Sequence, residues 1–475
     1  MLRRILPLSL LLAASAPLAH ATDLWQVWQL AKANDPAFQQ AKANRNASME
    51  AKPQAWAQLL PSIDLSANRT WDNRNGGQLY IYSNPPSDIT TTSNTRTNQW
   101  GATLTQTLFN WQQFKSVQGA DYTVAEAEAN YESTMQGLIV SVSQAYFNVL
   151  NAQDNLDADT ANLKALAKQY ERSQQQYKVG LIAITGVKEA EAGYDQAKAQ
   201  VITDRQALDQ AREALRAITG RYIPSLQSPR AQLPLNAPQP ENANDWVQRA
   251  MQDNPALAAA QQAQNVAQSQ VSQQEGGYMP SLNLVLQNMR SNSTGHQTIN
   301  NSNILPSSSN GSDTTIALKL NWNIFSGGAT RATVKQYQYQ ADSAMANEIS
   351  QRRSVEQQVR NAYLAVLSGI ASVKANRQSV EASRVSLQAT EAGLKVGTRT
   401  TLDVLTARKT LLDSQKAYYS ARYNYMLAVL QLEQAAGTLD EKDIQQLNGW
   451  LAPAGSPAPA PGTSEAMPAA TASGH

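Results

Sequence analysis

Residues able to support catalysis are scarce in this sequence. It has no cysteine and three histidines, His20, His296 and His475, of which the first lies in a leader-like segment and the last ends the chain. We find no phosphate-binding loop, no glycine-rich dinucleotide turn and no metal-ligand spacing. The sequence therefore argues against an enzyme and offers no set of residues for a metal or an organic cofactor.

More informative chemistry lies at two matching turns. Val179-Gly180 reappears as Val396-Gly397, 217 positions later. Glycine suits the left-handed residue that ends a helix, but such a cap does not require the valine before it, so both pairs are also candidate contact sites. Arg399 and Asp403 follow the second turn. The helix dipole alone favours an acid there, so helix capping and a functional charge remain alternatives for Asp403.

A spacing of this size recurs along the chain and indicates two structural repeats. Ala145-Tyr146 reappears as Ala362-Tyr363, 217 positions later, and Pro61-Ser62 reappears as Pro280-Ser281, 219 positions later. One duplicated unit explains both spacings. We expect a first repeat over residues 22–220, a linker over 221–252, a second repeat over 253–437 and a short further segment over 438–451.

The N-terminal segment has the pattern of a secretory signal. Arg3 and Arg4 precede an apolar run over residues 5–12, and Ala19-His20-Ala21 is a small-x-small cleavage site. We expect residues 1–21 to be removed on export. The chain has no cysteine for a lipid anchor, and the proline- and alanine-rich residues 452–475 are predicted to be a disordered tail.

Each repeat is predicted to contain one very long helix and a return helix. Apolar residues recur in steps of 4 and 3 over residues 138–177 and again over 355–394, which is the spacing of a coiled-coil seam. Asp159 occupies one seam position in the first copy. Residues 112–177 alone would make about 100 Å of helix. The two Val-Gly pairs then lie at the free tips of two helical hairpins.

After Pro61 and Pro280 the spacing of the apolar residues changes. It goes from the period of a helix, about 3.6 residues, to the two-residue period of a strand. The alternation runs through four segments, near residues 63–71, 100–108, 282–287 and 316–324. It predicts four strands of about ten residues with one apolar face and one face of Thr, Asn, Asp and Lys. The intervening segments 73–97 and 291–313 are rich in Asn, Ser, Thr, Gly and Pro, and we predict that they are solvent loops.

These strands have the length and pattern of membrane strands. No later stretch has the roughly 18 apolar residues of a spanning helix, so any membrane insertion must be by strands. Four strands cannot close a barrel, and an open edge in lipid leaves backbone groups unpaired. Several copies must therefore pool their strands, and only the larger counts leave an aqueous bore. Aromatic residues at or near the strand ends are the predicted membrane-interface girdle: Trp71, Trp100, Phe109, Trp322 and Phe325.

Several runs of residues resemble the TolC family of outer-membrane channels. They are residues 145–152, 179–185, 396–400 with Asp403-Val404-Leu405, and 421–425 with Gly437-Thr438-Leu439. The likeness covers about residues 23–450. It implies a mostly α-helical homotrimer with a 12-stranded transmembrane β-barrel, to which each chain gives four strands, and a periplasmic α-barrel. It also implies an outer-membrane location and docking with a periplasmic adaptor and an inner-membrane pump or ABC transporter. The expected function is drug efflux or type I protein secretion.

The resemblance also implies roles for residues near both tips. The adaptor-contact residues would be Val179, Gly180, Leu181, Thr185, Val396, Gly397 and Thr398. The periplasmic constriction and gate would involve Arg399, Asp403, Thr406, Gly186 and Leu394. Three of these depart from the family pattern. Thr406 stands where the family has a second acid, and Leu394 stands where it has a Tyr. Gly186 stands where the family has an Asp that pairs with the Arg. We therefore expect Arg399 to pair with Glu189 or Glu191 instead.

Two other readings of the chain stay open on the sequence. A secreted coiled-coil stalk or adhesin without a pore would also have long helices, but it would not require strands of membrane length. A periplasmic adaptor would need lipoyl-like and small β-barrel segments between its helices, and none occurs. The net charge of +2 provides no basic footprint for nucleic acid.

Overall fold

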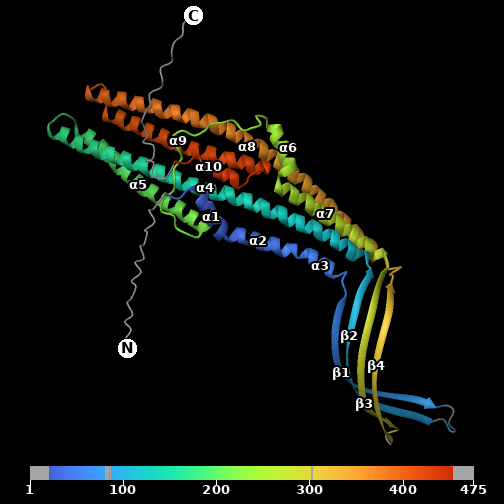
Figure 1. The fold of residues 1–475 in the computed structure, drawn as a ribbon. Helices are drawn as coiled ribbons and strands as arrows, with labels where there is room; N and C mark the ends of the chain where they lie inside the picture. The colour runs from blue at the N-terminus through green and yellow to red at the C-terminus, as the bar shows by residue number, and fades with distance from the viewer. Residues whose placement is uncertain (1–20, 81–84, 86, 301–302, 453–475) are drawn as a thin grey trace, which may run out of the picture. The chain divides into compact units, whose positions relative to one another are not determined.

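Long helices and one antiparallel sheet form most of the computed structural model, which describes residues 21–80, 85, 87–300 and 303–452 (Figure 1). The expected signal peptide, apart from Ala21, and the expected tail after Ala452 lie outside the described residues. The chain divides into two units that we describe separately. Unit 1 comprises residues 1–43, 131–256 and 352–475, and unit 2 comprises residues 44–130 and 257–351.

Both halves of the chain have helices before and after a pair of strands, and in each half a long helix and a return helix follow the strands. The first half contains α1 (Leu24–Asn34), α2 (Pro36–Met49), α3 (Ala51–Ala57), β1 (Ser62–Tyr80), β2 (Ser87–Phe109), α4 (Trp111–Lys178) and α5 (Ile184–Thr219). The second half contains α6 (Ala243–Asp253), α7 (Pro255–Glu275), β3 (Ser281–Ile299), β4 (Asn303–Asn321), α8 (Ala329–Lys395), α9 (Thr401–Ala436) and α10 (Glu441–Asn448). None of the described helices is long and apolar enough to cross a membrane.

Unit 1 is built around two helical hairpins, α4 with α5 and α8 with α9. The predicted seam is buried: side chains seven residues apart on α8 are each at most 8% exposed, namely Val359, Val366, Val373, Val380 and Leu387. An apolar side chain every seven residues keeps one stripe of a helix against its neighbours. The long, paired helices confirm the helical part of the predicted fold class.

The linker between the repeats and the C-terminal segment pack on the hairpins of unit 1. Isolated bridges join Thr22 to Leu226 and Pro229 to Leu451. Arg422, 5% exposed, donates to the carbonyl oxygen of Arg230 at 2.5 Å. Charge-assisted bonds to backbone carbonyls hold this extended segment against α9 without requiring secondary structure in it.

Unit 2 contains one four-stranded antiparallel sheet in the order β1-β2-β3-β4, which confirms the predicted strand number (Figure 1). The predicted strand lengths and solvent loops were wrong. The four strands have 19, 23, 19 and 19 residues, and the pairing continues through the expected loops, for example Asn73 with Asn94 and Ser293 with Ser309. Backbone ladders need no apolar side chains, so two polar strands that extend the same ladder stay paired.

The two faces of this sheet differ in composition, as the alternation predicted. Cross-strand neighbours Ile63, Leu104, Leu286 and Ile316 form one row of side chains on one face. The adjacent row on the other face is Asp64, Thr103, Gln287 and Thr315. Along β3, from Leu286 to His296, the residues of the first face are exposed and those of the second are partly buried. We call these the apolar face and the polar face.

A proline interrupts the helices that lead to β1. Pro53 lies in the first turn of α3, and the helix is broken between Met49 and Ala51. The proline ring clashes with the carbonyl group four residues earlier, which is that of Met49.

Candidate functional site

The tip of the first hairpin is a short turn between α4 and α5. The amide of Gly180 donates to the carbonyl of Tyr177 at 2.9 Å, and the amide of Leu181 donates to that of Gln176 at 2.9 Å. This is the pair of bonds that defines a Schellman motif, and Gly180 has the left-handed φ of 77° that the motif requires.

The second tip, between α8 and α9, repeats this geometry bond for bond. The amides of Gly397 and Thr398 donate to the carbonyls of Leu394 and Gly393 at 3.2 and 2.9 Å, and φ of Gly397 is 79°. The repeat in the sequence is therefore also a repeat of the backbone turn.

Both turns present apolar side chains to solvent. Val179 is 70% exposed, Leu181 is 73% exposed and Val396 is 75% exposed. A Cβ added at Gly180 or Gly397 would meet no atom within 4 Å, so no described part of the chain covers either glycine. Capping explains the glycines, but it does not explain the valines, which remain candidates for contact with another molecule.

The two tips differ in how their return helices begin. Thr400 and Asp403 form a capping box at the start of α9: the amide of Thr400 donates to the Asp403 carboxylate at 2.9 Å, and the amide of Asp403 donates to the Thr400 hydroxyl at 3.2 Å. The hydrogen bonds from Thr400 lower the pKa of Asp403, and the nearby charge of Arg399 adds to this effect. At the start of α5, Ala183 and Gly186 occupy the matching positions, and no side chain caps this helix.

Arg399 is placed by a glycine that the sequence analysis missed. A Cβ at Gly393 would lie 2.7 Å from Cγ of Arg399 and 3.1 Å from the hydroxyl of Thr398. The arginine stem therefore lies over the last turn of α8 at a position where only glycine leaves room. The matching residue in the first hairpin is Gln176, so the duplicated pattern did not single out Gly393.

The expected pair between Arg399 and Glu191 does not form within the described chain. Glu191 is bound instead to Lys188 at 2.7 Å and to the hydroxyl of Tyr170 at 3.1 Å. A lysine three residues away on the same helix is nearer to Glu191 than an arginine on the other hairpin, so Glu191 is paired within its own hairpin. Glu189 is exposed.

The remaining predicted gate residues lie near the same two turns. Leu394 is half-buried in the last turn of α8, where its carbonyl accepts from Gly397. Thr406 is exposed, and its hydroxyl donates to the carbonyl of Leu402 at 2.9 Å. Thr185 is exposed and Gly186 is half-buried in the first turn of α5. The structure gives none of these four a contact that assigns it a role.

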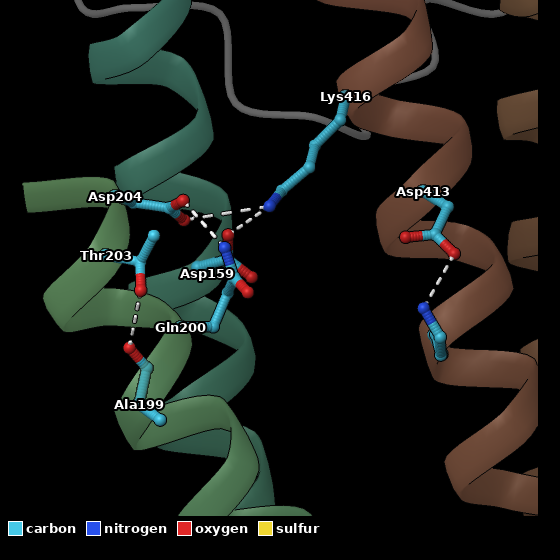
Figure 2. Close-up of polar contacts among 8 residues, drawn as sticks. Asp159, Ala199, Gln200, Thr203, Asp204, Asp413 and Lys416 are labelled. Carbon is cyan, nitrogen blue, oxygen red and sulfur yellow. Dashed lines mark hydrogen bonds and ion pairs between the residues drawn. The ribbon is translucent and has the colours of Figure 1, made fainter. Parts of the chain in front are cut away.

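A buried cluster of charges in unit 1 joins the two hairpins (Figure 2). Asp159 on α4 and Asp204 on α5 both face Lys416 on α9, and we call these three residues the ionic node. The Lys416 ammonium contacts the Asp159 carboxylate directly and lies 3.6 Å from that of Asp204. The three side chains are 2%, 12% and 25% exposed, in the order Asp159, Asp204, Lys416. Gln200 donates to Asp204 at 2.9 Å.

The ionic node has one cation for two acids, so the acids titrate unequally. Burial, with the adjacent Asp204, raises the pKa of Asp159 to about 6. Burial opposes ionisation of Asp204 as well, but its hydrogen bonds from Asp159 and Gln200 and the charge of Lys416 outweigh burial and lower its pKa. The node therefore holds a shared proton below about pH 6. The sequence analysis had placed Asp159 in the coiled-coil seam, and an acid at a seam position was the available signal.

The predicted interface aromatics lie in unit 2. Phe109 ends β2, while Trp322 directly follows β4 and is 56% exposed. Trp71 and Trp100 are 63% and 56% exposed, but they lie inside β1 and β2 rather than near strand ends. This part of the prediction was wrong because both strands continue through the segment assigned to a loop. Phe325 is 85% exposed outside the strands.

Comparison with known proteins identifies this architecture. A family model described as "Outer membrane efflux protein" matches residues 27–221 and 246–438. The chain is 34% identical over 455 residues to the outer membrane protein TolC of Escherichia coli, which covers 95% of this chain and 90% of TolC. It is 27% identical over 435 residues to the alkaline protease secretion protein AprF of Pseudomonas aeruginosa, which covers 90% of this chain and 87% of AprF.

The fold agrees with these matches. The crystal structure of the Campylobacter jejuni CmeC outer membrane channel superposes with a TM-score of 0.71 over 90% of each chain, at 16% sequence identity. The duplicated hairpins and the two-faced sheet are thus those of an outer-membrane efflux and secretion channel of Gram-negative bacteria, a transport protein and not an enzyme. The chain belongs to the TolC family. The alternative of a coiled-coil stalk without a pore is set aside.

Proposed function

We propose that three copies of this chain pool their sheets into one 12-stranded barrel whose polar faces line the channel. Within the described residues β1 pairs only with β2 and β4 only with β3, so each sheet has two open edges of 19 residues. Unpaired backbone groups are not tolerated in lipid, so each edge needs a neighbouring copy. Two copies would supply about eight strands, and side chains fill the interior of a barrel of that size. Larger barrels keep an aqueous bore. The likeness to TolC supports three copies.

The decisive observation for this proposal is the open-edged sheet with an apolar and a polar face. We would purify the processed protein in detergent, measure the mass of the complex, and record conductance in a planar bilayer. A complex of three copies that conducts ions supports the proposal. A monomer that passes no current contradicts it.

The exposed tips are proposed to dock a periplasmic adaptor protein, which would link the channel to an inner-membrane pump or ABC transporter. The support is the same valine-bearing Schellman turn at both tips, with valines that the cap does not need. The cargo class remains either small molecules or proteins, and the likeness to AprF, named as a protease secretion protein, favours including proteins.

The tip valines should control docking without controlling the fold. Val179 and Val396 are at least 70% exposed, so replacing both with aspartate removes no buried contact. We expect the double variant Val179→Asp/Val396→Asp to lose crosslinking to a co-expressed adaptor by about tenfold, while trimer mass stays unchanged. The matched control is Val179→Thr/Val396→Thr, which keeps the shape and should retain most of the crosslinking. Equal crosslinking in both variants would count against adaptor contact.

Asp403 is proposed to contribute to a negative collar at the periplasmic constriction, with one copy from each chain. Three carboxylates around one axis create a high local potential for cations. Asparagine in place of Asp403 removes the charge and keeps an oxygen that can accept the hydrogen bond of the Thr400 amide. We expect Asp403→Asn to weaken block by a trivalent cobalt complex by about tenfold in planar-bilayer recordings, with the helix cap retained. Unchanged block would assign Asp403 to capping alone.

A further inference from the structure

The nine charged residues of the four strands lie on both faces of the sheet, five on the polar face and four on the apolar face. The polar face carries Asp64, Asp72, Arg74, Asp313 and Lys319. The apolar face carries Arg69, Arg96, Arg290 and Asp88. Arg74 is neutralised by Asp72 at 3.2 Å, whereas among the described residues none of the arginines on the apolar face forms an ion pair. A lipid-facing surface with three unpaired cations needs an explanation, because such charges are costly unless a counter-charge meets them.

The three arginines lie close together with two tryptophans, and we call these five residues the Arg–Trp patch. The strand register places these residues in three successive rows of the apolar face. Arg290 lies beside Trp100 in the first row, Arg69 lies beside Asn98 in the second, and Arg96 lies beside Trp71 in the third. Strand spacing and rise place the arginine Cα atoms roughly 8 to 14 Å apart. The patch therefore has the size of a lipid headgroup. The nearest acid of this face on β2, Asp88, is eight residues from Arg96, about 26 Å along the strand.

Tryptophan stacking orients two of these guanidinium groups. The guanidinium carbon of Arg69 lies 5.0 Å from the ring centre of Trp71, and that of Arg290 lies 5.4 Å from the ring centre of Trp100. A guanidinium group that stacks through its face keeps its N–H edge free, and that edge matches two oxygens of a phosphate. Tryptophan itself favours the level of lipid headgroups.

The position and neighbours of the patch indicate which lipid it meets. Its rows continue those of Ile63, Leu104, Leu286 and Ile316 on the same face, in the direction of the strand hairpins and away from the helical ends of the strands. If the helices are periplasmic, as the proposed function requires, this end of the apolar band meets the outer leaflet. The row of Arg69 also contains Asn98, Asn292 and Asn310, whose amides can donate to and accept from sugar hydroxyls.

We propose that the Arg–Trp patch binds the phosphate groups of a phosphorylated glycolipid, lipopolysaccharide, in the outer leaflet around the channel. The inference rests on the proposed function for its orientation in the membrane. The stacked arginines hold the phosphates by bidentate hydrogen bonds, and the asparagine row contacts the sugar. The lipid in turn supplies the counter-charge that the described strands do not place beside these arginines.

The test compares binding of labelled, bisphosphorylated lipid A to the purified channel in detergent, followed by fluorescence anisotropy. We expect Arg69→Gln/Arg96→Gln/Arg290→Gln to bind at least about tenfold more weakly than the wild type, because charged hydrogen bonds to phosphate are lost. The matched control is Arg74→Gln, which lies on the polar face and should bind as the wild type does. Dephosphorylated lipid A should bind the wild type as weakly as bisphosphorylated lipid A binds the triple variant.

Three outcomes would overturn the proposal. They are equal binding by the triple variant, equal binding of dephosphorylated lipid A, and equal binding of phosphatidylglycerol, which would indicate a general attraction for anionic lipid. Arg69→Lys/Arg96→Lys/Arg290→Lys keeps the charge and should recover only part of the affinity, which provides a folded comparison. Planar-bilayer conductance of the same samples separates the two proposals. A wild type without conductance contradicts the proposed channel function. A triple variant that conducts and binds lipid A normally contradicts only the proposed lipid binding by the Arg–Trp patch.

Discussion

Replacing Lys416 with methionine should destabilise the helical hairpins of unit 1 by about 3 kcal/mol. The substitution leaves Asp159 and Asp204, which are 2% and 12% exposed, facing each other without a cation. Two buried acids without a counter-charge must lose solvation or take up a proton, and either costs free energy at neutral pH. Methionine has nearly the volume of the lysine stem, so the loss reports the charge rather than a cavity.

Thermal unfolding followed by the helical circular dichroism signal measures this effect. Lys409→Met is the matched control on the same helix, because Lys409 pairs with Asp413 at the surface, where the two side chains are 71% and 59% exposed. Surface pairs of this kind contribute at most about 1 kcal/mol. We expect the Lys416 variant to unfold at a clearly lower temperature than the Lys409 variant. Equal unfolding temperatures would show that the ionic node contributes nothing beyond a surface pair.

Replacing Asp159 with asparagine should remove a pH dependence of stability that the wild type has between about pH 4 and pH 6. The pKa of Asp159 is about 6 in the folded chain, above the ordinary value of 3.8 for an aspartate. In that interval the native state binds more protons than the unfolded state, so wild-type stability falls as pH rises. A shift of roughly two pKa units corresponds to about 3 kcal/mol as an upper bound. The asparagine variant mimics the protonated acid and should be the more stable protein at pH 7.5.

Other charges near Asp159 do not produce this effect. Asp204 has a lowered pKa, so the stability it contributes is lost only as pH falls below about 4. Acids elsewhere with raised pKa values, such as Asp154 and Glu433, titrate in the wild type and the variant alike. The measurement is the unfolding temperature of both proteins at pH 4, 5, 6 and 7.5. Parallel curves would contradict the proposed titration of Asp159.

Periodicity made the helices and the repeat predictable. The spacing of Val359, Val366 and Val373 identified the buried stripe, and the matching Val-Gly pairs located both tips. The paired strands were found by their alternation, but their extent was underestimated. Residues 73–97 and 291–313 are strands over most of their length although their composition is that of loops, because the ladder that holds them depends on backbone groups of a neighbouring strand.

Contacts between helices were less predictable. Asp159 was visible as an acid in an apolar seam, but its partners Asp204 and Lys416 are 45 and 257 positions away in the chain. For Arg399 the expected partner was Glu189 or Glu191, and in the structure Glu191 is bound by Lys188 and Tyr170. Charge pairing depends on which side chains come within a few ångströms, and no period in the sequence encodes that distance.

The sequence by itself determined the repeat with its matching tips, and also the hairpins and the two-faced strands, because in a periodic segment each residue type reports the face on which it lies. The class of protein followed from the resemblance of runs such as residues 145–152 to the TolC family. Only the tertiary structure decided which charges meet. It brought Lys416 to two acids on another hairpin, and it placed Arg69, Arg96 and Arg290 on one face of the sheet, where Asp88, the acid of that face in the described strands, is eight residues from Arg96. Register and helix packing set these distances, and electrostatic interactions depend on distance in space rather than separation along the chain.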